Sequence, residues 1–570
     1  MAKIEEPVFL LGFALMLVSH SLFAAPQKKN RYAPPSPEPS VAASPQRAQQ
    51  EDPSSEPKES DEKLVSRPST GGMIQQATVA RHLHETGKLW EAAAALSSVA
   101  KGETGDDERS RQLASFNLAK VLYELHFYQA AYNIFSSIAD NPSHIKFKET
   151  LLWLAKLADD LPEPAGVAEQ IGKYQQQELS RFNNPSQQEI YWKLRYYLGR
   201  YAYDRQQYED AILLFDGVEQ SSSYFARAQF FKGISNVQLK KSIPALGAFQ
   251  HVVDEAGNQV ELRDLAFLSM ARTYYSASIY VDDKNVPTID AQKLSAAIKY
   301  WNKVDVASEY WLDALFEESW AYFMAGDYAR ALGNIHTINA PYFPNAYYPE
   351  AKIIKAVIYF ANCRYEDAAS VVARFQEEYQ PIYKELSEVL ERFQGENQEE
   401  NLYQFLKNVK ENKVALSPKI KPIVELSLSD RQLLRHLNYI NMLEEENKRL
   451  QAAPTSFRKT GANQEIQDAV QHARAAAVKK IGQLVVARYQ RNLDELNEQI
   501  RNSSKIQIDV IAARRNQLDE ETASMRVSAD DSKRNIVKTD SEHEIWRFNG
   551  EYWRDELGFY RTTIPSQCGQ

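Results

Sequence analysis

Cysteine and glycine are scarce in this chain of 570 residues. Its two cysteines, Cys363 and Cys568, are too few for a structural zinc site or for a disulfide scaffold. In an oxidising compartment they could pair, but two unpaired thiols are the favoured interpretation, because the sequence does not place them within bridging distance. The 21 glycines, against 31 tyrosines, disfavour glycine-dependent phosphate loops and turn-rich β-folds.

A surplus of basic residues and the common catalytic motifs are also missing. The net charge of −9, from 67 basic and 76 acidic residues, disfavours a nucleic-acid partner. The sequence holds no glycine-rich loop ending in Gly-Lys-Ser/Thr, no Gly-x-Ser-x-Gly and no His-Glu-x-x-His, and its ten histidines are scattered. We therefore expect a protein that is not an enzyme and that binds no cofactor and no metal ion.

An apolar run of 11 residues, Val8 to Val18, lies near the N-terminus. It is short for a membrane span of about 20 residues and typical of the apolar region of a signal peptide. The small pair Ala24-Ala25 follows, so residues 1–25 are predicted to be a signal peptide, with an uncleaved N-terminal anchor as the alternative. Either outcome places the rest of the chain in the periplasm or elsewhere in the cell envelope.

Residues 26–72 differ sharply in composition from the rest of the chain. They hold nine of the 24 prolines and one aromatic residue, Tyr32, and their seven basic and seven acidic residues cancel. A segment with so few apolar groups cannot offset the entropy of ordering. It is predicted to be a disordered, proline-rich linker, which serves either to hold the folded part at a distance or merely as a spacer.

From Met73 onward a pattern of four positions recurs. A small residue is followed after 12 positions by Ala, and bulky apolar residues stand four and seven positions beyond that Ala. This spacing predicts pairs of antiparallel helices that touch at the small residue and the Ala, and that pack on the next pair through the bulky residues. The small residue and the Ala of the units are Ala80 and Ala92, Ala119 and Ala131, Gly199 and Ala211, Gly233 and Ala245, Ala271 and Ala297 (with an insertion around 281–292), Ser319 and Ala331, and Ala356 and Ala368.

The pattern resembles the tetratricopeptide repeat over residues 73–380, for example in YLGRYAYDRQQYEDAILLFDGV (Tyr197–Val218). The resemblance implies an all-α fold, a tetratricopeptide-like α-solenoid of helical hairpins. In that family fixed positions of the first helix of each hairpin line a groove for a protein or peptide segment. Here these positions are occupied mainly by aromatic and arginine residues, which are common anchors for protein partners. They are Lys193, Tyr196, Arg200, Tyr203, Phe230, Arg272, Tyr275, Phe316, Trp320, Phe323 and Phe360. About half of them are alternatively expected to be core residues.

Residues 381–540 are predicted to form long polar helices. Stripes of apolar residues at spacings of three and four, one from Leu433 to Leu450 and one from Ile481 to Ile500, favour two amphipathic helices with a loop at 452–464. They form an antiparallel hairpin or a short coiled coil, or they pack on the end of the solenoid.

Residues 541–570 form a short aromatic C-terminal segment. Aromatic residues at this density are expected to be buried, either on the C-terminal helices or in a partner. The predicted docking residues are Trp546, Phe548, Tyr552, Trp553 and Phe559. The sequence FNGEYWRDELGFY resembles the end of tetratricopeptide proteins in the cell envelope of gliding and predatory bacteria, some of which belong to an adventurous gliding-motility machine.

Together these features predict a non-enzymatic scaffold for protein–protein interaction in the cell envelope, which organises a multiprotein complex. One alternative is a periplasmic adaptor or chaperone. Another is an enzyme resembling the lytic transglycosylases, because Glu318-Ser319 matches their catalytic Glu-Ser pair, although the pair lies inside a repeat and the further motifs are missing.

Overall fold

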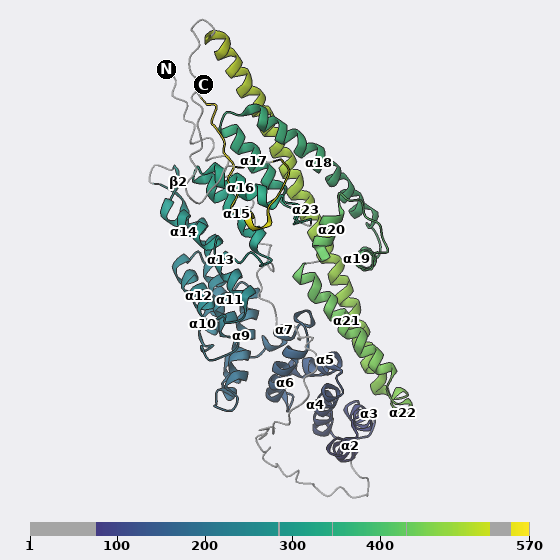
Figure 1. The fold of residues 1–570 in the computed structure, drawn as a ribbon. Coiled ribbons are helices and arrows are strands. Elements are labelled where there is room, and N and C mark those ends of the chain that lie inside the picture. Colours follow the sequence, from purple (N-terminus) through teal and green to yellow (C-terminus); the bar gives the residue numbers. More distant parts are fainter. Residues whose placement is uncertain are drawn as a thin grey trace, which may run out of the picture. The chain divides into compact units, whose positions relative to one another are not determined.

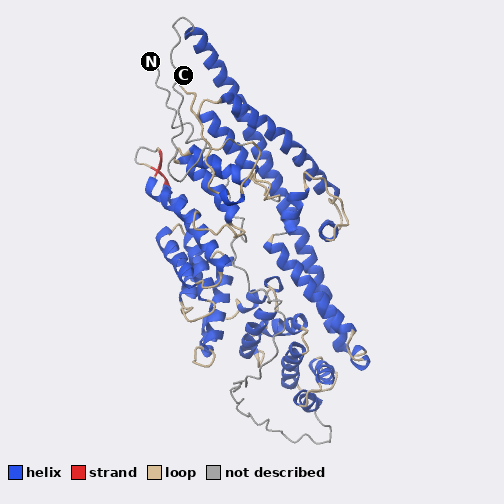
Figure 2. Ribbon diagram, in the orientation of Figure 1, coloured by secondary structure: helices blue, strands red, loops and turns tan. Residues whose placement is uncertain are grey.

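The computed structural model describes residues 76–282, 286–344, 346–428, 430–524, 546 and 549–568 (Figure 1). These residues are mostly helical, with a single pair of short strands among them, which confirms the all-α class (Figure 2). The predicted signal peptide, the proline-rich linker and residues 525–545 lie outside the described part. The chain divides into two compact units. The larger holds Phe182–Asn438 and Ala475–Gln570, and the smaller holds residues 76–181 and Tyr439–Arg474.

In the smaller unit, consecutive helices pack against each other in the order of the sequence. Asp107 caps the first turn of α4 by accepting a hydrogen bond from the amide of Ser110 at 2.8 Å. The helices are α2 (Gln76–Glu85), α3 (Leu89–Ala100), α4 (Glu108–Glu124), α5 (Tyr128–Ala139), α6 (Phe147–Asp160), α7 (Val167–Ile171) and α8 (Gln176–Leu179), with 3-10 turns η1 (Glu163–Ala165) and, at its boundary with the larger unit, η2 (Ser180–Phe182).

The larger unit continues the series of paired helices. They are α9 (Gln188–Asp204), α10 (Tyr208–Asp216), α11 (Phe225–Gln238), α12 (Ser242–Glu255), α13 (Val260–Ser278), α14 (Ala291–Trp301), α15 (Trp311–Met324), α16 (Tyr328–Ile338), α17 (Pro349–Ala361) and α18 (Tyr365–Arg392). The insertion expected between the helices of one unit is an antiparallel pair of strands, β1 (Ile279–Val281) and β2 (Pro287–Ile289).

The same turn joins the two helices of a pair at six places, two in the smaller unit and four in the larger. One residue in a left-handed conformation stands two positions before the second helix, as Gln206 does before α10. Its amide bonds the carbonyl three residues back, Tyr203, and the next amide, of Gln207, bonds the carbonyl of Ala202 at 3.0 Å. This arrangement is the Schellman motif, which satisfies carbonyls at the end of the first helix. The left-handed residues of the six turns are Gly87, His126, Gln206, Lys240, Gly326 and Cys363.

The small residues of the repeat are buried where they were expected, but in two units they accommodate a different partner. A Cβ added at Gly199 would lie 2.6 Å from the ring of Phe215, and one added at Gly233 would lie 2.4 Å from the ring of Phe249. These rings are the bulky residues four positions beyond the Ala, not the Ala itself. The expectation that the small residue meets the Ala is therefore incomplete, because in these units the glycine makes room for a phenylalanine.

The C-terminal helices of the larger unit include α19 (Gln398–Lys410), α20 (Lys421–Leu428) and most of α23 (Gly461–Ser524). A Cβ added at Gly482 of α23 would lie 2.3 Å from the backbone of Glu399, so the two helices approach closely there. The stripes predicted for two helices lie in α21 (Arg431–Gln451) and α23, and the predicted loop at 452–464 contains the short helix α22 (Thr455–Arg458). Within the described residues, no helix has the length and apolar character to cross a membrane.

Parts of α21, α22 and α23 belong to the smaller unit and pack on its hairpins. Phe457 meets Trp90 with 4.8 Å between ring centroids. Glu446 is buried and accepts a hydrogen bond from the amide of Gln129 at 3.0 Å, in the first turn of α5. A carboxylate at a helix N-terminus is favourable for the helix dipole, yet burial dominates and raises the pKa of Glu446 to about 7.

Candidate interaction surfaces

Six of the predicted groove residues are buried in the hairpins. Phe230 is 0% exposed and packs on Phe249 with ring centroids 5.7 Å apart, and Tyr275, 1% exposed, packs on Trp301 at 5.6 Å. Side chains this deeply buried have no surface left for a partner, and they stabilise the pairing of the helices. The other buried aromatic members are Tyr196, Trp320 and Phe323, and Lys193 is buried as well.

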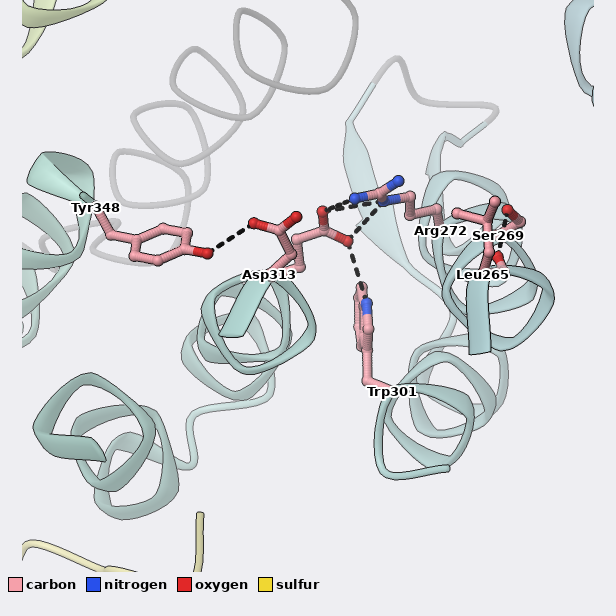
Figure 3. Close-up of polar contacts among 7 residues, drawn as sticks. Leu265, Ser269, Arg272, Trp301, Asp313 and Tyr348 are labelled. Atoms are coloured by element: carbon pink, nitrogen blue, oxygen red, sulfur yellow. Dashed lines mark hydrogen bonds and ion pairs between the residues drawn. The ribbon is translucent and has the colours of Figure 1, made fainter. Parts of the chain in front are cut away.

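The remaining groove residues keep part of their surface exposed, but they already contact neighbours in the chain. Arg272 of α13 forms a bidentate ion pair with Glu317 of α15, with its Nε 2.8 Å from Oε2 (Figure 3). The indole N–H of Trp301 also donates to Glu317, at 3.2 Å. Both members of the ion pair are largely buried. The bidentate contact joins α13 to α15, and the hydrogen bond from Trp301 links α14 to the same carboxylate.

Four other groove residues are partly exposed. The guanidinium of Arg200 lies over the ring of Phe231, 4.3 Å from its centroid. Tyr203 packs against the same Phe231 ring at 5.5 Å, and its burial raises the pKa of its hydroxyl. Phe316 packs on Tyr348, immediately before α17, and Phe360 packs on Tyr365, the first residue of α18. The structure thus distributes the predicted groove residues between the core and intramolecular contacts.

A second row of polar contacts lies beside this ion pair. Tyr348, immediately before α17, donates its hydroxyl proton to Asp313 of α15 at 2.7 Å (Figure 3). Within α13 the hydroxyl of Ser269 donates to the carbonyl of Leu265 (Figure 3). The Ser269 bond lies within one helix, whereas the contacts of Arg272 with Glu317 and of Tyr348 with Asp313 join successive hairpins.

The Glu318-Ser319 pair, which matches the lytic transglycosylases, is closed off from solvent. Glu318 accepts hydrogen bonds from the side-chain amides of Asn302 and Asn334, the latter at 2.9 Å. Ser319 donates its hydroxyl proton to the carbonyl of Leu315 in its own helix at 2.8 Å. Burial raises the pKa of Glu318 to about 7, a value typical of a general acid, but both side chains are buried and directed into the fold.

The C-terminal residues 549–568, called the C-terminal strap below, run along α16. The amide of Gly558 donates to the hydroxyl of Thr337 at 3.0 Å, and the amide of Thr562 donates to the carbonyl of Ala329 at 3.1 Å. The ring of Tyr552 stacks on His336 with centroids 4.5 Å apart. The expectation that this segment folds back on the C-terminal helices is therefore wrong in its location, because the strap packs on the hairpins.

A disulfide fixes the end of the strap. Cys363, in the turn between α17 and α18, is bonded to Cys568, and the amide of Gln567 donates to the carbonyl of Asn362 beside it. The favoured interpretation of two unpaired thiols is thus wrong. The sequence offered no signal for the pairing, since 205 positions separate the two cysteines and the strap alone brings them together.

The strap leaves two of its four large aromatic side chains in solvent. Trp553 and Phe559 are 42% and 68% exposed, and Trp546, just before the strap, is 63% exposed. The two tryptophan rings contact each other with centroids 5.0 Å apart, and the indole N–H of Trp546 donates to Glu551 at 3.0 Å. Phe548 lies outside the described residues. Of the predicted docking residues, Tyr552 is half-buried on His336, and three are accessible. These three, called the exposed aromatics below, are Trp546, Trp553 and Phe559.

The backbone around Trp553 is held in place by one side chain. The hydroxyl of Tyr560 accepts a hydrogen bond from the amide of Trp553 at 2.8 Å and donates to its carbonyl. The carbonyl of Tyr560 itself lies where a Cβ at Gly333 of α16 would stand, at 1.6 Å. Gly333 was not singled out in the sequence, and a small residue within an amphipathic helix is the only signal that could have indicated a close approach.

No protein-family model and no curated protein sequence matches this chain.

Proposed function

We propose that this chain is a non-enzymatic scaffold for protein–protein interaction in the bacterial cell envelope, built on a tetratricopeptide-like solenoid. The six helix–turn–helix junctions with the same hydrogen-bonded turn support the solenoid, because a solenoid is built from one kind of hairpin repeated along the chain. The partners are proteins or peptide segments of the envelope, and the complex organised by the scaffold is the unit of function.

The observation that carries this proposal is the set of exposed aromatics on a fixed strap. Trp and Phe side chains of this size are normally buried, and exposed examples mark interaction sites. The strap fixes their backbone through the disulfide and through hydrogen bonds to α16, so little entropy is lost when a partner binds. The predicted groove contributes less, since its aromatic residues are in the core or in intramolecular contacts.

The disulfide supports the location outside the cytoplasm. Disulfides persist in oxidising compartments and are rare in the cytosol, where thiols are kept reduced. The N-terminal apolar run supports the same location. The resemblance of the tail to envelope proteins of gliding bacteria makes the gliding-motility machine the first complex to test.

The proposal is tested by crosslinking and affinity purification of the mature protein from its own envelope. A variant with Trp546→Ala, Trp553→Ala and Phe559→Ala is compared with the native chain. The matched control is Leu213→Ala with Ile243→Ala, which removes exposed apolar side chains from α10 and α12. Loss of about 2–4 kcal/mol per binding hot spot is expected for the strap variant and none for the control.

Three outcomes discriminate the hypotheses. Fixed partners in constant ratio that disappear in the strap variant support the scaffold. Many partners in variable amounts support the adaptor or chaperone instead. Unchanged capture by the strap variant, with unchanged helicity in circular dichroism, contradicts the assignment of the binding surface. Alkylation of thiols in intact cells before lysis tests the compartment, because a scaffold in the envelope keeps Cys363 and Cys568 protected from the reagent.

A further inference from the structure

The covalent bond at the end of the strap differs in accessibility on its two sides. Cys568 is exposed, whereas Cys363 is half-buried in the turn between α17 and α18. A thiolate that attacks a disulfide must reach one sulfur in line with the bond, so accessibility selects the sulfur that is attacked. Attack on Cys568 releases Cys363, which stays with the hairpins.

The strap has few other means of staying in place. Among its described side chains, Leu557 alone is buried, and the large aromatic rings of Trp553 and Phe559 are exposed. It contains one 3-10 turn, η3 (Arg554–Glu556), and no longer element in its described part. Its contacts with α16 and with the turn before α18 include hydrogen bonds of three amides, of Gly558, Thr562 and Gln567, and the rings of Tyr552 and Tyr560 against His336. Just after α16, the hydroxyl of Tyr342 also donates to the carbonyl of Tyr552 at 2.9 Å.

We infer that the Cys363–Cys568 disulfide is a site of thiol–disulfide exchange with a dithiol, and that this exchange controls whether the strap presents its aromatic residues. The dithiol's thiolate forms a bond to Sγ of Cys568, the bond between the two cysteines breaks, and Cys363 leaves as a thiolate and takes up a proton. The second thiol of the dithiol then displaces Cys568. Both cysteines end as thiols, and the dithiol ends as a disulfide, with two electrons transferred.

Reduction therefore releases the strap from α16. Segments with few regular backbone hydrogen bonds and with little buried apolar surface are the parts of a protein that open most easily. Once the end is free, the hydrogen bonds between Tyr560 and Trp553 no longer hold Trp553 in a fixed place relative to the hairpins. This inference rests on the proposed function in that the exposed aromatics are its binding surface. Oxidised chains are expected to bind a partner and reduced chains to bind it weakly.

The site of attack is tested on the purified mature protein with glutathione as the probe. A short exposure is quenched with an alkylating reagent, and the mixed disulfide is located by mass spectrometry of the peptides that contain each cysteine. We expect glutathione on Cys568 at about tenfold excess over Cys363. Equal labelling, or an excess on Cys363, overturns the assignment of the attacked sulfur.

The release of the strap is tested by hydrogen exchange before and after reduction with dithiothreitol. The amides of Gly558, Thr562 and Gln567 are expected to exchange at least about tenfold faster in the reduced chain. The amides of Gln207 and Lys241, which make turn hydrogen bonds remote from the strap in sequence, serve as controls and stay unchanged. Unchanged protection of the three strap amides overturns the inference, because the strap would then be held without its disulfide.

A variant gives an independent check. Cys568→Ser is expected to show the exchange pattern of the reduced chain, and its helicity is compared by circular dichroism with that of the native protein. If this variant does not fold, the reduced native chain still decides the outcome. Neither measurement needs a partner, so a strap that opens on reduction supports the exchange site even if the exposed aromatics bind nothing. Equal binding of partners by the oxidised and the reduced chain overturns the redox regulation of binding but does not contradict the proposed scaffold function.

Discussion

Large aromatic side chains of the helical hairpins such as Phe230 lie inside the fold, whereas Trp553 and Phe559 of the C-terminal strap face solvent. Phe230 and Tyr275 contact other rings and have almost no exposed surface, while Trp553 and Phe559 are 42% and 68% exposed. The two regions differ in how their backbones are satisfied. Helices bond their amides internally, which leaves the side chains to join one helix to the next.

The strap has no such internal ladder. Its amides bond to acceptors on the hairpins, such as Thr337 and Ala329, so the backbone makes the attachment and the side chains do not have to. The comparison shows that aromatic residues alone do not indicate a binding site. An aromatic residue is free to bind a partner when something other than its own ring holds its segment in place.

The largest effect on stability is expected from removing a ring in the hairpins. Phe230→Ala deletes a fully buried side chain that packs on Phe249, and the free energy of unfolding should fall by about 3–5 kcal/mol. Leu213→Ala, at an exposed position of α10, should change it by less than about 0.5 kcal/mol. Urea unfolding followed by circular dichroism measures both. Similar values for the two variants would contradict the division between core and surface.

The next effect concerns the buried carboxyl groups, which make the hairpins sensitive to pH. Burial raises the pKa of Glu446 from its ordinary value of 4.5 to about 7. The folded state therefore binds a proton that the unfolded state has lost between these values, so stability falls as pH rises from about 4.5 to about 7, and then stays constant. A shift of this size corresponds to roughly 3 kcal/mol.

Glu446→Gln is the matched variant, because the amide oxygen still accepts from the amide of Gln129 and carries no charge. We expect the variant to match the native chain at pH 5 and to melt at a higher temperature at pH 8. Glu318 of the larger unit, whose pKa is also raised to about 7, leaves part of the pH dependence in place. If the melting temperature depends on pH in the same way in the variant and the native chain, ionisation of Glu446 does not destabilise the folded state.

A smaller effect is expected where a glycine makes room for a ring. Gly233→Ala places a methyl group 2.4 Å from Phe249, and displacing the ring should cost about 1–3 kcal/mol. Gly247→Ala, in helix α12, meets nothing within 4 Å and should be neutral or stabilise the protein by up to about 1 kcal/mol. Thermal unfolding of the two variants decides whether the close approach, and not helix propensity, requires glycine at 233.

The helices were predictable from the sequence because their signals are local. Spacings of three, four and 12 residues located the pairs, and Ala211 and Ala245 are fully buried as the pattern requires. The turns were less visible, since His126, Gln206, Lys240 and Cys363 occupy left-handed positions at which glycine would have been the recognisable residue.

The candidate site could be predicted only in part. Trp553 and Phe559 were singled out by their density near the end of the chain, and they are exposed. Their attachment was not predictable, because the partners of the strap, Gly333 and Cys363, are distant in sequence and have no periodic signal. About half of the groove residues are in the core, as the alternative expectation had it, and partner binding by the others stays a prediction. The positions that face a groove in a family pattern are also the ones nearest the next hairpin, and the large rings at Phe230 and Tyr275 pack there.

The smallest effect on overall stability, and the most specific, is expected at Gly333. A methyl group there would meet the carbonyl oxygen of Tyr560 at 1.6 Å, which is backbone and cannot rotate away, so Gly333→Ala should displace the strap from α16. The strap buries only Leu557 among its described side chains, and a displaced strap regains conformational entropy that offsets the lost burial, so the free energy of unfolding should change by less than about 1 kcal/mol. Hydrogen exchange of the Gly558 and Thr562 amides should nevertheless increase by about tenfold or more, even with the disulfide intact. Gly247→Ala is again the control for adding a methyl group to a helix. Unchanged exchange in Gly333→Ala would mean that the strap does not rest on α16. The distinction between a segment attached through its backbone and hairpins joined by their side chains would then be wrong for the strap.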